Sequence, residues 1–291
     1  MMVALLLLLA GLSGEYTNPR AAPLELKLRL VEEINRARTE EGLSAVVYSP
    51  ALSEAADAHC REMLLEGYIS HWNRAGHKPY LRYTWAGSQG NTAENITSLR
   101  DSEFPDDVKI LWVSMFTGHQ RFMAEVPPDD GHRRSILNPR QTHVGIGVAY
   151  NPSGMRLIEV YEARYAEFNA MPRRARLRDA LAVSGRVLSP NLEFEALTVF
   201  YEPPPAAMSA SELGRTRSYG LPNEQRHERT RLQQGRYVDG SRGSVELTPD
   251  GSFRAPLVFW KGRPGVYTVG VWVRERGEEA FLGGLLSVVV E

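Results

Sequence analysis

The spacing of apolar residues predicts helices in the first part of the chain. Leu30, Ile34 and Ala37 recur at helical intervals, while Glu, Arg and Asn occupy the opposite face of the same stretch. A second helix is expected in SPALSEAADAHCREMLLEGY, where Ser49 suits the N-cap and Pro50 suits the first helical position. Both stretches end near a glycine, as helices commonly do.

Alternating apolar positions then predict an antiparallel hairpin. In HVGIGVAYN the residues Val144, Ile146 and Val148 alternate with smaller ones, the turn signal NPSG follows, and MRLIEVYEARY supplies the partner strand. A third helix is expected in PDDVKILWVSMF, beginning near Asp106 or Asp107. Helices mixed with an antiparallel sheet indicate an α+β domain.

In the last third of the chain, apolar residues recur at every second position. Strand-like runs such as FEALTVFYE, FRAPLVFW and GVYTVGVWVRER are separated by TPDG, KGRPG and RGEE. Several short strands joined by Gly- and Pro-containing turns predict a small all-β, Ig-like sandwich. We therefore expect the α+β domain at residues 24–168, a linker at 169–184 and a β-sandwich accessory domain at 185–291.

Composition and charge narrow the class of protein. The 291 residues are 43% hydrophobic and 24% charged, which is typical of a soluble globular protein. The formal net charge of −1 gives no basis for binding nucleic acid or an anionic membrane surface. The single cysteine, Cys60, excludes an intrachain disulfide and is expected to be a buried, inert thiol.

The N-terminal segment indicates export. The apolar run from Val3 to Leu12 is too short to span a bilayer, which takes roughly 20 residues. Small residues follow the run, as they do near the cleavage point of a signal peptide. Residues 1–20 are therefore expected to be a signal peptide or a short apolar anchor, and the protein is expected to be secreted or held in the cell envelope, without any other membrane span.

Three residues that suit metal or acid–base chemistry stand in loop-like surroundings. His71 follows the second predicted helix, Glu94 lies in TAENI and His132 lies in DDGHRRSIL. Two imidazoles and one carboxylate are zinc-type ligands and would leave an open position for water. Their spacing matches no local ligand motif such as H-E-x-x-H.

Each of these residues also has a purely structural interpretation. His71 could cap the carbonyls of the preceding helix, and Glu94 could accept hydrogen bonds from loop amides. Asp130 is an expected N-cap, which would put His132 in the first turn of the helix that follows. His59 lies at helical spacing within the second helix and is expected to be structural.

Together these segments resemble the CAP superfamily of cysteine-rich secretory, antigen 5 and pathogenesis-related 1 proteins, and in particular its bacterial SCP-like branch. The resemblance is carried by LVEEINRARTEEGLSAVVYSPALSEAADAHCREM, SHWNRAGHKPYLRYTWAG, AENI, LWVSM and GHRRSILNPRQTHVGIGVAY, in the family's order over roughly residues 28–165. It implies an α-β-α sandwich and a surface cleft lined by two histidines and up to two acids. His71, Glu94 and His132 would line that cleft as metal-binding or catalytic residues, with zinc or another divalent cation as cofactor.

Two departures from the family's pattern concern the acids. The second acid would fall three residues after Trp112, where this chain has Met115. The inserted segment FMAEVPPDD brings Glu125, Asp129 and Asp130 close in sequence to the second histidine, and one of them could replace the missing carboxylate. Because acidic residues before a helix usually cap it, we favour capping as their role.

Three functions stay open at this point. We favour a secreted binding module whose cleft holds a divalent metal or a small or lipid-like ligand, while the sandwich attaches to a cell-envelope partner. The alternative is a metal-dependent, protease-like hydrolase in which His71 and His132 bind zinc and Glu94 is a third ligand or a base. The third is a structural or adhesive envelope protein, which an exposed Trp260 or Trp272 would favour. The family's fold leaves open whether any reaction is catalysed, because one fold hosts many functions.

Overall fold

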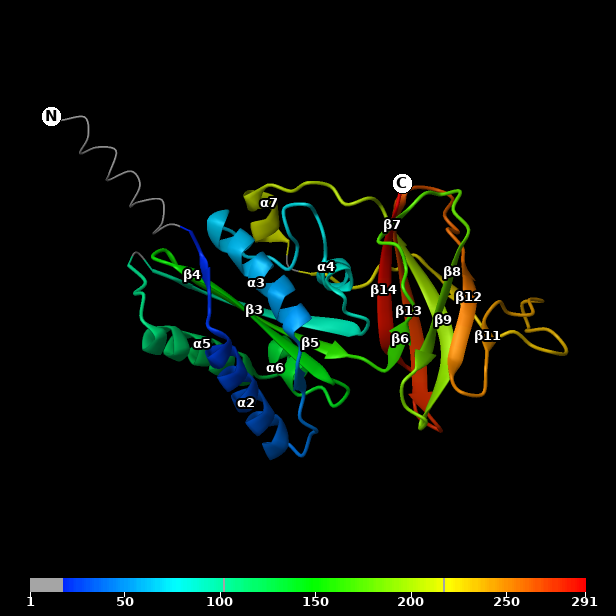
Figure 1. Ribbon diagram of the computed structural model, residues 1–291, viewed down its shortest axis with the longest axis horizontal. Coiled ribbons are helices and arrows are strands. Elements are labelled where there is room, and N and C mark those ends of the chain that lie inside the picture. Colours follow the sequence, from blue (N-terminus) through cyan, green and yellow to red (C-terminus); the bar gives the residue numbers. More distant parts are fainter. Residues whose placement is uncertain (1–17, 102, 217) are drawn as a thin grey trace. The chain divides into compact units, whose positions relative to one another are not determined.

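The computed structural model describes residues 18–101, 103–216 and 218–291 (Figure 1). Most of the predicted signal segment, residues 1–20, lies outside the described residues. Within them, no helix is both long enough and apolar enough to cross a membrane. The chain forms two compact units, and neither is one continuous stretch of sequence. Of the described residues, the first contains those up to Arg74, Ala93–Tyr161 and a short segment that begins at Met208. The second contains Ala75–Thr92, Glu162–Ala207 and the chain from Ser218 onward.

The first unit is an α-β-α arrangement around one sheet. The strands are β1 (Arg20–Ala21), β2 (Val47–Tyr48), β3 (Asn91–Arg100), β4 (His143–Asn151) and β5 (Gly154–Ala163). Their order is β1-β4-β5-β3, and β2 pairs with β4 in parallel. The accompanying helices are α2 (Leu24–Glu40), α3 (Pro50–Leu65), α5 (Val108–Met123), α6 (Gly131–Ile136) and α7 (Ala210–Arg215). The predicted α+β class and the predicted hairpin of β4 and β5 are confirmed.

The alternation of side chains along β4 explains the two helical layers. Val144, Ile146 and Val148 join one apolar cluster with residues of α2 and α5. The glycines between them face the other way, beneath α3. A Cβ atom at Gly147 would lie 2.4 Å from the Cβ of Ala56, so only glycine lets the helix come this close.

Polar side chains of α3 also bind the backbone of β4. The Ser53 Oγ accepts a hydrogen bond from the Ile146 amide at 2.8 Å, and the Asp57 Oδ1 accepts one from the Val148 amide at 2.7 Å. The other oxygen of Asp57 pairs with the buried ammonium of Lys27 at 2.5 Å. These contacts satisfy backbone donors that would otherwise be buried without a partner.

The local signals at helix ends are confirmed. Ser49 is the N-cap of α3, where its side chain accepts from the Leu52 amide, and Pro50 is the first residue of the helix. Asp107, rather than Asp106, caps α5, because its Oδ1 accepts from the Lys109 amide at 2.7 Å and from the next amide at 3.2 Å. Cys60 is a free, fully buried thiol, as predicted.

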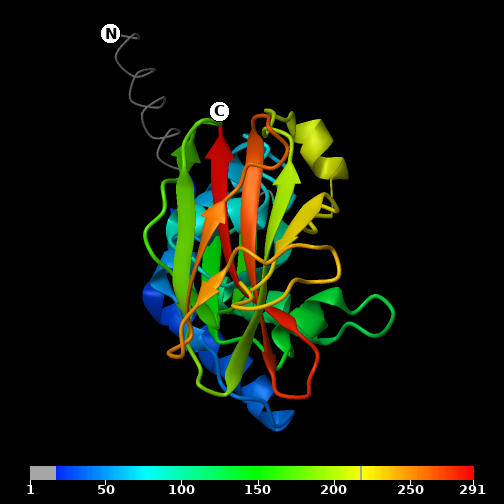
Figure 2. The ribbon, with the colours of Figure 1, turned by 90° about the vertical axis from the view of Figure 1, so that its right-hand side faces the viewer.

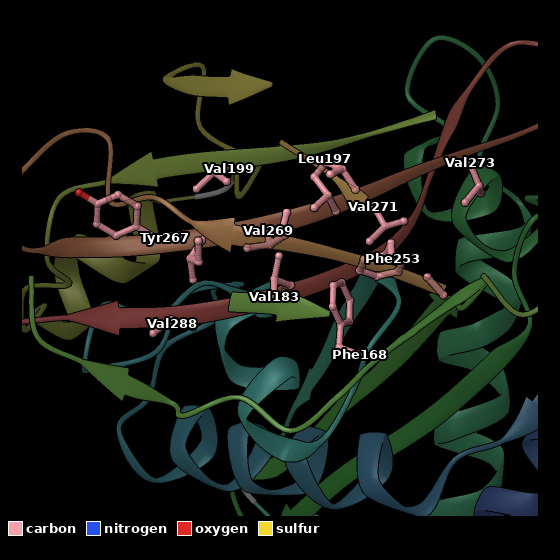
Figure 3. Packing of buried hydrophobic residues seen from close by; sticks show 14 of the residues in the cluster. Phe168, Val183, Leu197, Val199, Phe253, Tyr267, Val269, Val271, Val273 and Val288 are labelled. Atoms are coloured by element: carbon pink, nitrogen blue, oxygen red, sulfur yellow. The ribbon is translucent and has the colours of Figure 1, made fainter. Parts of the chain in front are cut away.

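The second unit is a sandwich of two sheets, seen in Figure 2. One sheet has the order β10-β9-β13-β14-β7 and the other has the order β11-β12-β8-β6. The strands are β6 (Ala166–Phe168), β7 (Arg174–Ala175), β8 (Leu181–Val187), β9 (Leu192–Glu202), β10 (Gln225–Glu228), β11 (Glu246–Leu247), β12 (Ser252–Leu257), β13 (Gly265–Glu275) and β14 (Phe281–Val290). Side chains from both sheets fill the core between them, including Val183 and Phe253 from one and Val199, Tyr267 and Val269 from the other (Figure 3).

Two segments differ in role from what their sequence indicated. The stretch 169–184, expected to be a linker, contains β7, which pairs with β14 in parallel, and the start of β8. Helix α4 (Pro79–Ala86), which is not among the helices expected from the sequence, packs its Tyr80 and Leu81 against the sandwich strands. Its local signals were present, because Pro79 begins the helix and Gly87 ends it in the left-handed conformation at φ 104°.

Candidate functional site

The first candidate histidine is paired with the candidate carboxylate. The Nδ1 atom of His71, just past α3, lies 2.9 Å from the Oε1 atom of Glu94 on β3. Glu94 is only 2% exposed, whereas the His71 side chain keeps 18% of its surface in solvent. His71 therefore bonds a carboxylate across 23 positions of sequence rather than serving only as a helix cap.

The turn that carries His71 is fixed from both sides. The buried His59 places its Nε2 atom 2.8 Å from the carbonyl oxygen of Ser70, so His59 is structural, as expected. The Ser70 hydroxyl donates to the Thr216 carbonyl at 2.9 Å and accepts from the Trp72 amide at 3.1 Å. The residues before and after His71 are thus tied down, which limits where the imidazole can move.

The second histidine has a carboxylate of its own, Glu125, from the inserted segment. The Nδ1 atom of His132 is hydrogen-bonded to the Oε1 atom of Glu125. The Oε2 atom of the same carboxylate accepts from the His132 amide at 2.9 Å and from the Arg133 amide at 3.4 Å. Glu125 therefore caps α6 and also holds the imidazole, which combines the two roles considered for the inserted acids.

Asp130 has a different role from the one expected for it. It occupies the N-cap position of α6, but its side chain makes no capping hydrogen bond. Its Oδ1 atom instead lies 3.1 Å from the Nε atom of Arg134, one turn further along. The capping expected of Asp130 is supplied by Glu125, because the chain before α6 folds back and brings that carboxylate to the first amides.

Helix α6 is anchored by a buried arginine. Arg38, on α2, is fully buried and donates to the carbonyl of Ile136, the last residue of α6, at 2.6 Å and to that of Asn138, just after the helix, at 3.0 Å. Its Nε atom donates to the Ser44 carbonyl at 2.9 Å. The bond to Ile136 satisfies a buried carbonyl, so the guanidinium holds the end of the helix that carries His132.

A side chain from β3 connects the two pairs. Asn95, the residue after Glu94, donates through its Nδ2 atom to the backbone carbonyl of His132 at 3.0 Å. The His132 ring also packs on the buried Phe122, with 4.7 Å between ring centroids. Two consecutive residues of β3 thus contact the two candidate histidines. The Glu94 side chain bonds the ring of His71, and the Asn95 side chain bonds the backbone carbonyl of His132.

The electrostatics of Glu125 favour its charged form. Partial burial opposes the charge, but hydrogen bonds from the His132 ring and from the His132 and Arg133 amides outweigh burial and lower the pKa of the Glu125 carboxyl. An ionised Glu125 accepts hydrogen bonds only, so it keeps a proton on the Nδ1 atom of His132. In both pairs the carboxylate engages Nδ1, so Nε2 is the ring nitrogen that points away from the carboxylate.

The structure does not assemble the predicted residues into a three-ligand metal centre. In residues 18–101, 103–216 and 218–291, no three His, Cys, Asp or Glu side chains form a group that could hold a metal ion. The helical position where a second acid was expected holds Met115, which is fully buried in the apolar cluster of the first unit. Metal binding by His71, Glu94 and His132 stays a prediction.

Sequence reasoning missed a buried polar network in the first unit. His119 on α5 places its Nδ1 atom 2.9 Å from the Oε1 atom of Glu159 on β5, and the Tyr161 hydroxyl donates to Glu159 Oε2 at 2.7 Å. Burial disfavours the charged imidazole, but attraction to Glu159 and their hydrogen bond outweigh it and raise the pKa of His119. Burial, and then Glu159, raise the pKa of Tyr161 well above its usual range. The available signal was the carboxylate of Glu159 between the apolar residues Ile158 and Val160.

Comparisons with known proteins agree on the class of the first unit. A family model described as CAP, the cysteine-rich secretory protein family, matches residues 31–161. The uncharacterized protein YkwD of Bacillus subtilis (strain 168) is 28% identical over 120 residues, which is 41% of this chain and 40% of the relative. The chain therefore spans well under half the length of this curated relative.

Two solved structures are also similar. One is an extracellular protein containing an SCP domain from Bacillus anthracis str. Ames, at 18% identity and a TM-score of 0.38, covering 48% of this chain and 41% of that one. The other is an outer surface protein from Borrelia burgdorferi, at 15% identity and a TM-score of 0.40, covering 50% of this chain and 98% of that one.

Proposed function

Because residues 31–161 form a domain of the cysteine-rich secretory protein family, we propose that the chain is an extracellular binding module that takes up a divalent cation through His71 and His132. The observation that carries the proposal is that each imidazole is held through Nδ1 by its own carboxylate, Glu94 or Glu125. Metal-binding histidines in proteins are oriented in this way, with the ring nitrogen that does not touch the metal bonded to a carboxylate.

The donor chemistry suits a borderline cation such as zinc. Neutral imidazole nitrogens are good zinc ligands, and two of them leave further positions for water or a bound molecule. In this proposal Glu94 and Glu125 are positioning residues, not ligands. This differs from the role of third ligand that the sequence suggested for Glu94, because its Oε1 atom is engaged by His71 Nδ1.

Binding is favoured over hydrolysis by the same contacts. A metal-assisted hydrolase needs a carboxylate placed as a base for the bound water or as a further ligand. Here one oxygen of Glu94 bonds an imidazole, and both oxygens of Glu125 bond His132. An extracellular location is proposed from the apolar run between Val3 and Leu12 together with the domain's family.

Zinc titration by calorimetry on the full chain tests the proposal. Wild type is compared with His71→Asn/His132→Asn, in which each Asn amide can still donate to the carboxylate while the Nε2 atom is lost. The matched control is His143→Asn, a histidine at the start of β4 that hydrogen-bonds its neighbour Thr142. We expect wild type and control to bind zinc with a dissociation constant on the order of micromolar and the double variant to lose binding.

Either of two results would overturn the proposal. Wild type that takes up no zinc under these conditions would show that the two imidazoles do not form a cation site. Equal zinc binding by wild type and the double variant would place the metal elsewhere on the chain. Circular dichroism of each variant establishes that the domain is folded before the binding data are compared.

A further inference from the structure

The second unit contains a pocket of about 530 Å³ that the proposed function does not use. It is lined by two alanines and by Glu195, His227, Arg229, Tyr237 and Trp272. Trp272 lies between Val271 and Val273 on β13, which both belong to the core between the two sheets. Because neighbouring side chains of a strand point to opposite faces, Trp272 lies on the outer face of the five-stranded sheet.

Two register shifts in the sheet shape the floor of the pocket. On β9, Ala196 pairs with Trp272 and Phe194 pairs with Val273, so Glu195 is an extra residue without a partner opposite it. The pairing of β13 with β14 also shifts next to Trp272. Such bulges re-aim side chains. The bulge on β9 explains how the consecutive residues Glu195 and Ala196 both line the same pocket.

The two aromatic residues contribute carbon surface. The indole Nε1 of Trp272 donates to the Thr198 hydroxyl oxygen at 2.9 Å, and the Tyr237 hydroxyl donates to the Thr230 carbonyl at 2.7 Å. With their polar atoms engaged by the protein, the rings offer a ligand mainly apolar area. The same bonds fix the rings before any ligand arrives, which lowers the entropy lost on binding.

The remaining lining residues supply both hydrogen-bond donors and hydrogen-bond acceptors. Arg229 is about half exposed, lies 5.1 Å from the centroid of the Tyr237 ring and presents several N–H donors. Glu195 presents carboxylate acceptors. His227 is hydrogen-bonded through Nδ1 to the Thr198 hydroxyl, which leaves its Nε2 atom for the pocket. Each of these two charges also has an opposite partner outside the lining, because Arg229 lies 3.5 Å from Asp239 and Glu195 lies 3.3 Å from the Nε atom of Arg274. Balanced charges favour a neutral ligand over an anion or a cation.

We propose that this pocket is a carbohydrate-binding site for a neutral pyranose residue of a glycan. A pyranose ring has apolar C–H faces that match aromatic carbon and hydroxyl groups that both donate and accept hydrogen bonds. The pocket provides aromatic carbon surface, hydrogen-bond donors and hydrogen-bond acceptors. Its volume lies within the range of small-molecule sites, about 300–1,000 Å³.

The test is binding of the full chain to an array of oligosaccharides built from neutral hexoses, N-acetylhexosamines and uronic acids, with calorimetry on the strongest neutral oligosaccharide. Arg229→Ala and Tyr237→Ala remove pocket groups without touching the sandwich core. Arg263→Ala is the matched control, because Arg263 also lies over a tyrosine ring, Tyr201, at 5.0 Å but does not line the pocket. We expect each pocket variant to weaken binding about tenfold or more and the control to change it less than about twofold.

The inference would be overturned by no binding to any neutral oligosaccharide, by binding to acidic oligosaccharides only, or by equal affinity in wild type and both pocket variants. The His71→Asn/His132→Asn variant should bind the oligosaccharide as wild type does. Loss of binding in that variant would tie the glycan to the histidine site and would equally contradict a pocket on the sandwich. Zinc uptake and glycan binding are therefore tested independently.

Discussion

Glu125 binds His132 twice, accepting one hydrogen bond from its backbone amide at 2.9 Å and another from its imidazole. The carboxylate comes from the segment inserted before α6, and the histidine is the second residue of that helix. One side chain therefore sets both where the helix begins and which way the imidazole points.

Replacing Glu125 should destabilise the domain and loosen His132 together. In Glu125→Ala the first amides of α6 lose their acceptor, so we expect the free energy of unfolding to fall by about 1–2 kcal/mol, the usual effect of losing a helix cap. Urea denaturation of the full chain measures the change. The control is Asp129→Ala, an exposed acid of the same segment, for which we expect less than about 0.5 kcal/mol. Equal effects of the two substitutions would contradict the capping role.

The pair of His119 and Glu159 should make stability depend on pH. His119 has a raised pKa in the folded chain, so the folded state holds the proton more tightly than the unfolded state, whose histidine titrates near about 6.5. The stabilisation is fully present below that value and is lost as pH rises through the folded pKa. Relative to His119→Gln, which can donate to Glu159 but does not titrate, wild type should lose stability between mildly acidic and alkaline pH. Parallel unfolding curves for the two proteins across that range would refute this linkage.

Close packing of α3 on β4 should make Gly147 intolerant of any side chain. The Cβ of Gly147→Ala would lie 2.4 Å from both the carbonyl carbon and the Cβ of Ala56, and backbone atoms cannot move aside easily. We expect a loss of about 1–3 kcal/mol or more in the free energy of unfolding. Gly131→Ala is the control, because nothing lies within 4 Å of its added carbon. Thermal unfolding of both variants measures the difference, and a neutral Gly147→Ala would show that the helix can shift.

Arg38 should keep the segment that follows α6 in its folded conformation. Arg38→Met keeps much of the side chain's length but leaves the carbonyls of Ile136, Asn138 and Ser44 without their donor. Of these three bonds only the one to Ile136 is buried, and the Asn138 carbonyl also accepts from the Gln141 amide. A buried carbonyl left unsatisfied costs about 1–3 kcal/mol, so we expect a loss of that size or local opening of residues 136–141. Hydrogen exchange of the amides of that segment distinguishes the two. Unchanged exchange and stability would show that water replaces the guanidinium.

The sequence predicted the elements whose signals are local. Ser49 with Pro50, and Asp107, mark helix starts because a cap bonds amides only two or three residues away. The alternation in β4 predicted a strand, and the glycines within it proved to be the contact with α3. Helix α4 carried comparable signals at Pro79 and Gly87 but was not among the expected helices. Its apolar residues bury against the sandwich of the second unit, a contact that local sequence does not show.

The candidate site could be predicted only in part. His71 and Glu94 were expected to share a site, and the structure pairs them directly. Glu125 was named as one of three acids able to replace a missing carboxylate, but sequence alone favoured simple capping. Its contact with the His132 ring depends on the path of the loop before α6, which no short-range pattern specifies.

By itself the sequence determined the helix caps, the hairpin, the buried lone thiol and the family resemblance, because each depends on neighbouring residues or on ordered segments of chain. Tertiary structure alone decided which carboxylate holds each histidine, that Arg38 anchors α6 across 98 positions, and that Glu195 and Trp272 share a pocket. These are contacts between side chains far apart in sequence or displaced by a bulge. The geometry of these contacts follows from how helices and strands pack together. The residues that neighbour each position in the sequence do not specify that packing.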